Sequence, residues 1–113
     1  MTFMNVESED LQKLEIRAGT IILCENVKDS DKLLKLRVDF GSGEIRNIFT
    51  GMARWYKPKD LTGVQTIFLT NIKPRKMMGE ESHGMILAFH TPDNGKPVFL
   101  IPRDHAENGW RLI

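Results

Sequence analysis

The sequence predicts an all-β fold: a small five-stranded barrel with a short helix between the third and fourth strands and a C-terminal extension. Strict alternation of apolar and charged residues over residues 34–40 is typical of a half-buried strand. Other short segments rich in branched apolar residues are separated by glycine, proline and asparagine, which favour turns. With 113 residues, 41% of them apolar and 27% charged, the chain is long enough for one soluble domain, residues 1–113, and too short for two.

The first three strands lie close together in the sequence. Residues 14–24 form the first predicted strand, and Gly19 in its middle predicts a bend or a bulge. The alternating segment Leu34–Phe40 is the second strand. Gly41–Gly43 supplies a flexible turn, after which residues 44–50 return as the third strand and complete a hairpin.

The stretch at residues 52–61 lacks alternation and contains Pro58, so it predicts one or two turns of helix. Three further strands are predicted downstream, at residues 64–70, 85–89 and 98–101, the last of them after a turn at 92–95. A helix between the third and fourth strands of a small barrel is the layout of the oligonucleotide-binding (OB) fold. Residues 1–10 are expected to be a mobile or loosely docked lead-in.

Composition and motifs argue against several functions. The single cysteine, Cys24, has no partner for an intramolecular disulfide, and this fits a cytoplasmic protein. No cluster of residues predicts a metal or a cofactor. No apolar run reaches the roughly 18–20 residues that cross a bilayer, and the first ten residues lack the basic region of a signal peptide. His83, His90 and His105 are scattered, and neither a Ser/His/Asp motif nor a glycine-rich phosphate loop is present. We therefore expect a protein that is not an enzyme and does not enter a membrane.

A basic cluster without acids occupies residues 71–79, where Lys73, Arg75 and Lys76 surround Pro74. The net charge of the chain is only +1, so this cluster is a local feature. Because proline fixes φ, the predicted loop is stiff, and less entropy is lost when its cations bind phosphates. The methionines at 77 and 78 are expected either to contact a nucleobase or to cover one end of the barrel.

Cations also lie on the second strand. Lys35 and Arg37 are two residues apart and share one face, and Lys32 precedes them. This face is either a solvated surface or a surface that binds a nucleic-acid backbone, since OB barrels use outward residues of the second and third strands. Arg54, Trp55 and Tyr56 likewise have two interpretations: a platform on which unpaired bases stack, or a cap for one end of the barrel.

Five blocks of this sequence together resemble the tRNA-binding domain family, which includes stand-alone dimeric proteins and the C-terminal domain of many bacterial methionyl-tRNA synthetases. The blocks are Asp29–Leu36, Arg46–Ala53, Trp55–Pro58, Asn71–Gly79 and Ser82–Ala88. They occur in the family's order and spacing, and the resemblance covers roughly residues 9–113. Thr50 stands where the family usually has serine, and Trp55 where tyrosine or a small residue is common; neither change removes a hydrogen-bonding or stacking capability.

The resemblance implies an OB barrel that binds the outer corner of tRNA by shape, free-standing or attached to an aminoacyl-tRNA synthetase. It also implies a homodimer supported by an extension at about residues 90–113. The implied tRNA face consists of Lys32, Lys35, Arg37, Asn47, Trp55, Lys73, Arg75, Lys76, Ser82 and Met85. Its cations would contact phosphates, and Asn47, Ser82 and Met85 would contact ribose and base edges.

A secretion-related chaperone that binds unfolded peptides offers an alternative function, because it shares this fold and its dimer. That branch lacks the full Asp-x-Asp-Lys-Leu-Leu and Lys-Pro-Arg-Lys blocks. This chain has both, at residues 29–34 and 73–76. The sequence therefore favours tRNA as the ligand.

Overall fold

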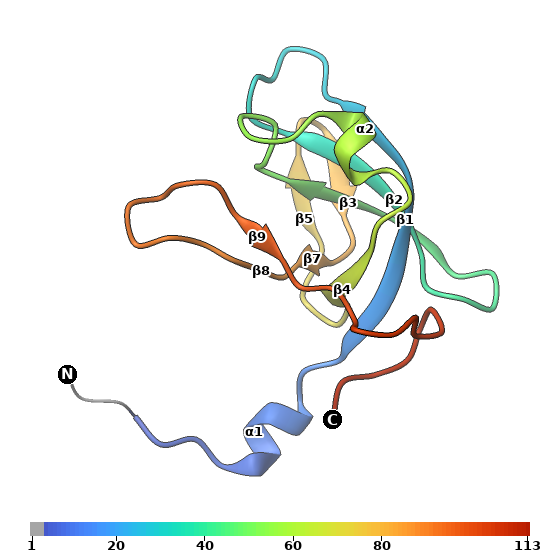
Figure 1. The fold of residues 1–113 in the computed structure, drawn as a ribbon, viewed down its shortest axis with the longest axis vertical. Helices are drawn as coiled ribbons and strands as arrows, with labels where there is room; N and C mark the ends of the chain where they lie inside the picture. Colours follow the sequence, from blue (N-terminus) through green and yellow to red (C-terminus); the bar gives the residue numbers. More distant parts are fainter. Residues whose placement is uncertain (1–3) are drawn as a thin grey trace.

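Five antiparallel strands form one curved sheet in the order β3-β2-β1-β4-β7 in the computed structural model, which describes residues 4–113 (Figure 1). The strands of this sheet are β1 (Ile16–Asn26), β2 (Leu34–Asp39), β3 (Ile45–Thr50), β4 (Gln65–Leu69) and β7 (Met85–Ile86). The remaining elements are the helices α1 (Ser8–Gln12) and α2 (Pro58–Leu61), and two short ribbons, β5 (Arg75–Met77) with β6 (Glu80–Ser82) and β8 (Ala88–Phe89) with β9 (Val98–Phe99). The predicted all-β barrel with a helix between its third and fourth strands is confirmed.

The long strand β1 is the centre of the sheet. Its first half, from Ile16 to Thr20, pairs with β4, and its second half, from Thr20 to Asn26, pairs with β2. The sequence predicts a bend or a bulge at Gly19; the bulge is not there, because the register shifts between Ile21 and Leu23. A glycine is required at position 19 for another reason, because a Cβ there would lie 2.7 Å from Val38 Cγ1.

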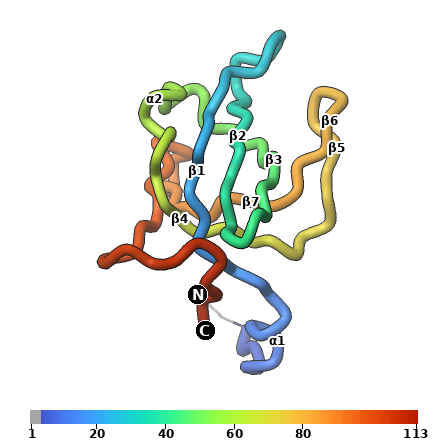
Figure 2. Tube along the Cα trace, turned by 90° about the vertical axis from the view of Figure 1, so that its right-hand side faces the viewer, coloured from blue at the N-terminus to red at the C-terminus, as the bar shows by residue number. Residues whose placement is uncertain are grey.

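The barrel is nearly closed where the residues before β7 return to β3. The amide of His83 donates a hydrogen bond to the carbonyl of Asn47 (2.9 Å), and β3 packs against both β6 and β7. The β5–β6 ribbon therefore lies alongside β3, on the outside of the barrel (Figure 2). This position brings residues 71–83 against the β2–β3 hairpin.

Several predicted boundaries change. Helix α2 is confined to Pro58–Leu61, and residues 52–56 form a tight turn in which Met52 O accepts the amides of Trp55 and Tyr56. The predicted strand 85–89 is interrupted at Leu87, whose amide donates to Ile67 O (3.2 Å). It therefore becomes β7 and β8, and β8 pairs with β9 rather than with the barrel.

The N-terminal region contains a short helix that the sequence pattern did not predict. Helix α1 has no buried residue, and Glu7 and Asp10 cap its first turn. The side-chain amide of Asn71 holds the linker after α1: its Nδ2 donates to Lys13 O (2.7 Å), and its Oδ1 accepts from the Glu15 amide (2.9 Å). Of the expected lead-in at 1–10, residues 1–3 lie outside the described part of the chain.

Residues 109–112 fill the sheet edge beside the first half of β1. The amide of Gly109 donates to Ala18 O (2.8 Å), the amide of Ala18 donates to Trp110 O (2.9 Å), and the amide of Leu112 donates to Ile16 O (2.7 Å). The side chains of Trp110 and Leu112 nevertheless stay exposed. This segment therefore extends the sheet beside β1 through its backbone and leaves apolar side chains exposed.

The core is built from the inward residues of the alternating strands. Leu34, Leu36 and Val38 are fully buried, as are Ile48 and Phe68. Cys24 also faces this core, and burial raises the pKa of its thiol to about 11, with a smaller contribution from the charge of Glu25. Within residues 4–113, no helix has the length and apolarity needed to cross a membrane.

Candidate nucleic-acid interface

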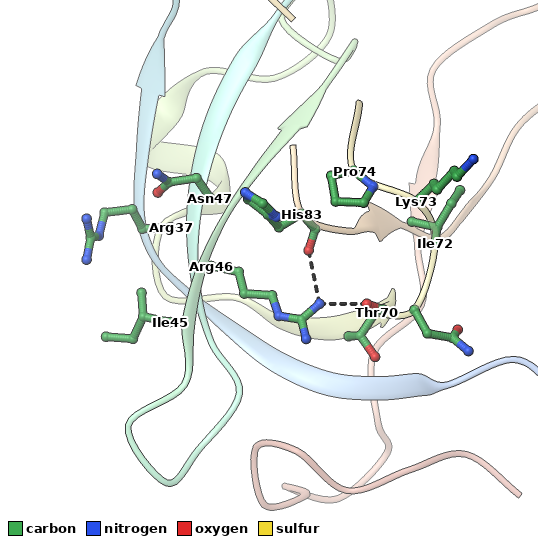
Figure 3. Close-up of a pocket in the computed structure, with 10 residues that line it drawn as sticks. Arg37, Ile45, Arg46, Asn47, Thr70, Ile72, Lys73, Pro74 and His83 are labelled. Carbon is green, nitrogen blue, oxygen red and sulfur yellow. Dashed lines mark hydrogen bonds between the residues drawn. The ribbon is translucent and has the colours of Figure 1, made fainter. Parts of the chain in front are cut away.

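A groove of about 660 Å³ lies between the β2–β3 hairpin and the chain that follows β4. Arg37 and Asn47, which are opposite each other in the β2–β3 register, form one wall. Ile72, Lys73 and Pro74 form the other wall, so residues far apart in sequence lie on the two sides of the groove (Figure 3). The strand alternation explains the first wall, because Arg37 and Asn47 share the outer face of the sheet.

Arg46 lies at the base of the groove, and hydrogen bonds hold it there. Its Nη1 donates to Thr70 O (2.6 Å) and to His83 O (3.2 Å), as Figure 3 shows, and its Nη2 pairs with Glu44 Oε2 (2.8 Å). Arg46 is opposite the buried Val38 in the register, so its side chain is on the inner face, at the mouth of the barrel. It therefore joins β3, β4 and the segment before β7.

Glu44 binds a second arginine under this groove. Arg17 donates two parallel hydrogen bonds to Glu44, from Nη1 to Oε1 (2.9 Å) and from Nη2 to Oε2 (2.7 Å), and a third from Nε to Thr70 Oγ1 (3.0 Å). The hydrogen bonds from Arg17 lower the pKa of Glu44; partial burial opposes this, and the charges of Arg17 and Arg46 add to the lowering. The same interaction raises the pKa of Arg17.

We expect the Glu44→Gln variant to be less stable by about 1 kcal/mol at neutral pH, a value that allows for solvent screening of a partly exposed carboxylate. A carboxylate with a lowered folded-state pKa stabilises the fold above its unfolded pKa of about 4.3, and this stabilisation is lost as the pH falls through the lower folded value. Urea denaturation of both proteins between pH 3 and pH 7 measures the difference. A stability gap that is the same at pH 3 and pH 7 would contradict this role for Glu44.

Four cations border the groove or the neighbouring ribbon without a carboxylate partner. Arg37, Lys73, Arg75 and Lys76 are all exposed, and among residues 4–113 none of them makes a salt bridge. Because no internal carboxylate neutralises them, their charge is available to an external anion. Arg37 and Lys73 line the groove together with Asn47, and Arg75 and Lys76 lie in the adjoining strand β5.

Lys35 and Lys32 have different surroundings. Lys35 shares the outer face of β2 with Arg37, and its Nζ lies 2.7 Å from Glu80 Oε1 on β6. Lys32 is exposed in the loop before β2, where its carbonyl accepts the Ala53 amide (3.0 Å). Lys35 therefore lies on the face that carries Arg37 but is already paired, whereas Lys32 lies in the loop before that strand.

The remaining expected contact residues are less accessible. Ser82 is buried: its Oγ accepts from the Phe49 amide (3.0 Å) and donates to Gly84 O (3.2 Å), so its hydroxyl fixes β6 on β3. Met85 is half-buried in β7, opposite Leu69. Trp55 is half-buried outside the groove, with the Arg54 guanidinium 5.6 Å from the centre of its ring. Its neighbour Tyr56 packs on Phe99 (4.8 Å between ring centres) and does not offer a free stacking surface.

The basic segment is not the loop that its sequence predicted. Residues 75–77 and 80–82 pair as a two-stranded ribbon, and Met78 and Gly79 both have positive φ at its turn, as a type I′ turn requires. The methionines were expected either to contact a nucleobase or to cover one end of the barrel. Met78 does not cover the barrel, because it is the exposed tip of this ribbon. The cations Arg75 and Lys76 are therefore carried by a hydrogen-bonded strand and not by an irregular loop.

The predicted site lacked four polar or charged residues that line the groove: Arg46, Thr70, Asn71 and His83. His83 follows the buried Ser82, and neighbours in a strand point to opposite faces, so a buried Ser82 would have placed His83 outside. Asn71 belongs to the basic segment, and its side chain holds the linker after α1. The inward direction of Arg46 follows from its spacing of two from the core residue Ile48.

Known proteins resemble this chain in sequence and in structure. A family model described as "Putative tRNA binding domain" matches residues 16–111. A methionine–tRNA ligase of Clostridium acetobutylicum is 45% identical over 100 residues, which are 88% of this chain and 15% of that ligase, so the chain spans only a small part of this relative. A crystal structure of a MetRS-related protein from Pyrococcus horikoshii superposes with a TM-score of 0.91 at 34% identity, over 98% of this chain and 100% of that one. The chaperone CsaA from Bacillus anthracis superposes with a TM-score of 0.85 at 26% identity, over 97% of this chain and 100% of that one. The chain belongs to the tRNA-binding domain family.

Proposed function

We propose that this chain is a non-catalytic module that binds tRNA by its shape, with the groove and the β5–β6 ribbon as the contact surface. One observation carries this proposal: Arg37 and Lys73 line the groove, Arg75 and Lys76 follow in the adjoining strand β5, and all four are exposed without a carboxylate partner among residues 4–113. Unpaired cations of this kind bind phosphates and position an RNA without reading its bases.

The side chains have distinct roles in this proposal. Arg37 and Lys73 bind phosphates from opposite walls of the groove, and Arg75 and Lys76 extend the contact along the ribbon. The amide of Asn47 has both donors and an acceptor for ribose hydroxyls or base edges. Ser82 acts by holding the ribbon, and Met85, Trp55 and Lys32 lie at the margins of the contact.

The proposed module works in the cytoplasm as a homodimer, either free-standing or with an aminoacyl-tRNA synthetase as partner. A second copy fits the apolar surface that α1 and residues 110–113 form, where Leu11, Leu14, Trp110 and Leu112 are exposed. Two linked copies widen the RNA contact and raise affinity through effective concentration. Sedimentation equilibrium at micromolar concentration should give twice the 13.0 kDa chain mass, and a monomer alone would refute the dimer.

A salt series of tRNA binding tests the function. If about five phosphates are neutralised, log K against log salt falls with a slope of roughly −3.5 to −4.5. The measurement uses a methionine tRNA transcript and a second tRNA, and shape reading predicts similar affinity and slope for both.

An unfolded peptide provides the comparison for the chaperone alternative, which the similarity to CsaA favours. Peptide binding without salt-sensitive tRNA binding would overturn the proposed function. Affinity confined to one of the two tRNAs would overturn shape reading alone.

A further inference from the structure

Glu80 is the carboxylate that pairs with a cation of the proposed tRNA surface. Its Oε1 lies 2.7 Å from Lys35 Nζ, and the Lys35 side chain retains 25% of its exposure. Lys35 is two residues from Arg37 on the same strand, so their Cα atoms are about 7 Å apart and their side chains leave the same face. Lys35 is thus placed to continue the cationic surface, but a carboxylate of the same chain neutralises it.

The ribbon holds Glu80 in this position by a separate contact. Ser82 shares its face of β6 with Glu80, and the hydrogen bonds of Ser82 to Phe49 and Gly84 fix that face against β3. Glu81, between them, points the other way, and its Oε2 lies 3.5 Å from His83 Nε2. The Lys35–Glu80 pair is therefore made by a ribbon that is anchored independently of it.

We infer that Glu80 competes with RNA for Lys35. A phosphate of bound RNA can contact the Lys35 ammonium group only by displacing the Glu80 carboxylate. This inference rests on the proposed tRNA binding. RNA gains a phosphate contact at Lys35 only when it breaks the Lys35–Glu80 pair, so the pair subtracts from the affinity of every ligand that reaches Lys35. Glu80 therefore lowers the affinity of this surface for RNA without contacting the RNA itself.

Removing the competitor gives a measurable gain. The Glu80→Gln variant should bind a tRNA transcript roughly two- to fivefold more tightly at low salt, since partly exposed ion pairs are worth up to about 1 kcal/mol. Its salt slope should steepen by about 0.7–0.9, because in the wild type the displaced Glu80 carboxylate takes up a cation again and offsets the release of one counterion. The Glu81→Gln variant is the matched control, because it makes the same change in charge on the same strand, with 51% rather than 50% side-chain exposure. It should not show the steeper slope.

A double-mutant cycle separates competition from general electrostatics. Lys35→Gln should cost affinity less in the wild-type chain than in the Glu80→Gln background, and the two costs should differ by the same two- to fivefold. Thermal unfolding of each variant shows that the fold is retained.

Three results would overturn the inference while wild-type tRNA binding stands. Weaker binding by Glu80→Gln would show that the pair anchors the ribbon. Equal gains in Glu80→Gln and Glu81→Gln would show a general effect of charge. Additive effects in the cycle would show that Lys35 is not released, as when Glu25, its neighbour across β1 and β2, captures the freed ammonium. Failure of the wild-type chain to bind tRNA would refute the proposed function itself.

Discussion

The triple variant R37Q/K73Q/R75Q should lose about a hundredfold in affinity for tRNA at low salt. Each of the three cations is exposed and has no carboxylate partner in the described part of the chain, residues 4–113, so its charge is available to a phosphate. A hydrogen bond between charged groups contributes about 1 kcal/mol or more after solvent competition, and three such contacts give roughly two orders of magnitude. The salt slope should become shallower by about 2 to 3. Fluorescence titration of one tRNA transcript across a salt series measures both quantities.

A variant with the same loss of charge elsewhere provides the control. Lys59, Lys96 and Arg103 are exposed, and the segments that carry them lie on the opposite side of the barrel from the β5–β6 ribbon (Figure 2). K59Q/K96Q/R103Q should therefore change the affinity by less than about threefold through long-range electrostatics. If the two triple variants bind equally weakly, the groove is not the contact surface and only net charge matters.

Gly41→Ala should destabilise the fold more than any substitution on the candidate tRNA surface. Gly41 has φ +84° in the turn between β2 and β3, and a Cβ there would lie 2.5 Å from the carbonyl oxygen of Asn108. The left-handed backbone costs about 1 kcal/mol for alanine, and the collision with backbone adds a displacement of the segment that carries Asn108. We expect a total of about 3 kcal/mol, which lowers Tm by more than about 10 °C in a domain of this size.

Gly43→Ala separates the two contributions. Gly43 is in the same turn with φ +80°, and nothing lies within 4 Å of the position that an alanine Cβ would take, so the substitution there has only the cost of the backbone conformation. Thermal unfolding should show a loss of about 1 kcal/mol for Gly43→Ala and about three times that for Gly41→Ala. Equal losses would mean that residues 108–109 adjust to a methyl group at little cost.

The sequence predicted the strands whose pattern is local. In β2, alternation placed Leu34, Leu36 and Val38 inside and Lys35 and Arg37 outside, because a period of two is read directly along the chain. The helix before β4 was predicted from Pro58 and the loss of alternation. Both features depend only on residues close in sequence.

Features that depend on distant partners left no such pattern. The β5–β6 ribbon is polar on both faces, so no alternation marked it, and Met78 is an unusual residue for a turn position with positive φ. Ser82 became buried because β3 presents a free amide at Phe49, which no local rule predicts. The groove itself exists only because residues 70–74 and 83 return to β3.

The pairing of residues 109–112 with β1 has a consequence for folding during synthesis. Leu14 and Arg111, which a hydrogen bond joins at this junction, are 97 residues apart in the sequence. A chain emerging from the ribosome can form the β2–β3 hairpin early, but the edge of β1 at residues 16–18 stays unpaired until residues 109–112 have been made. An unpaired edge of this kind is a template for association with other chains. Because these contacts join residues far apart in sequence, the nascent chain can associate with other chains until synthesis is complete. The folding time should be that of the slower, all-β proteins, on the order of milliseconds to seconds.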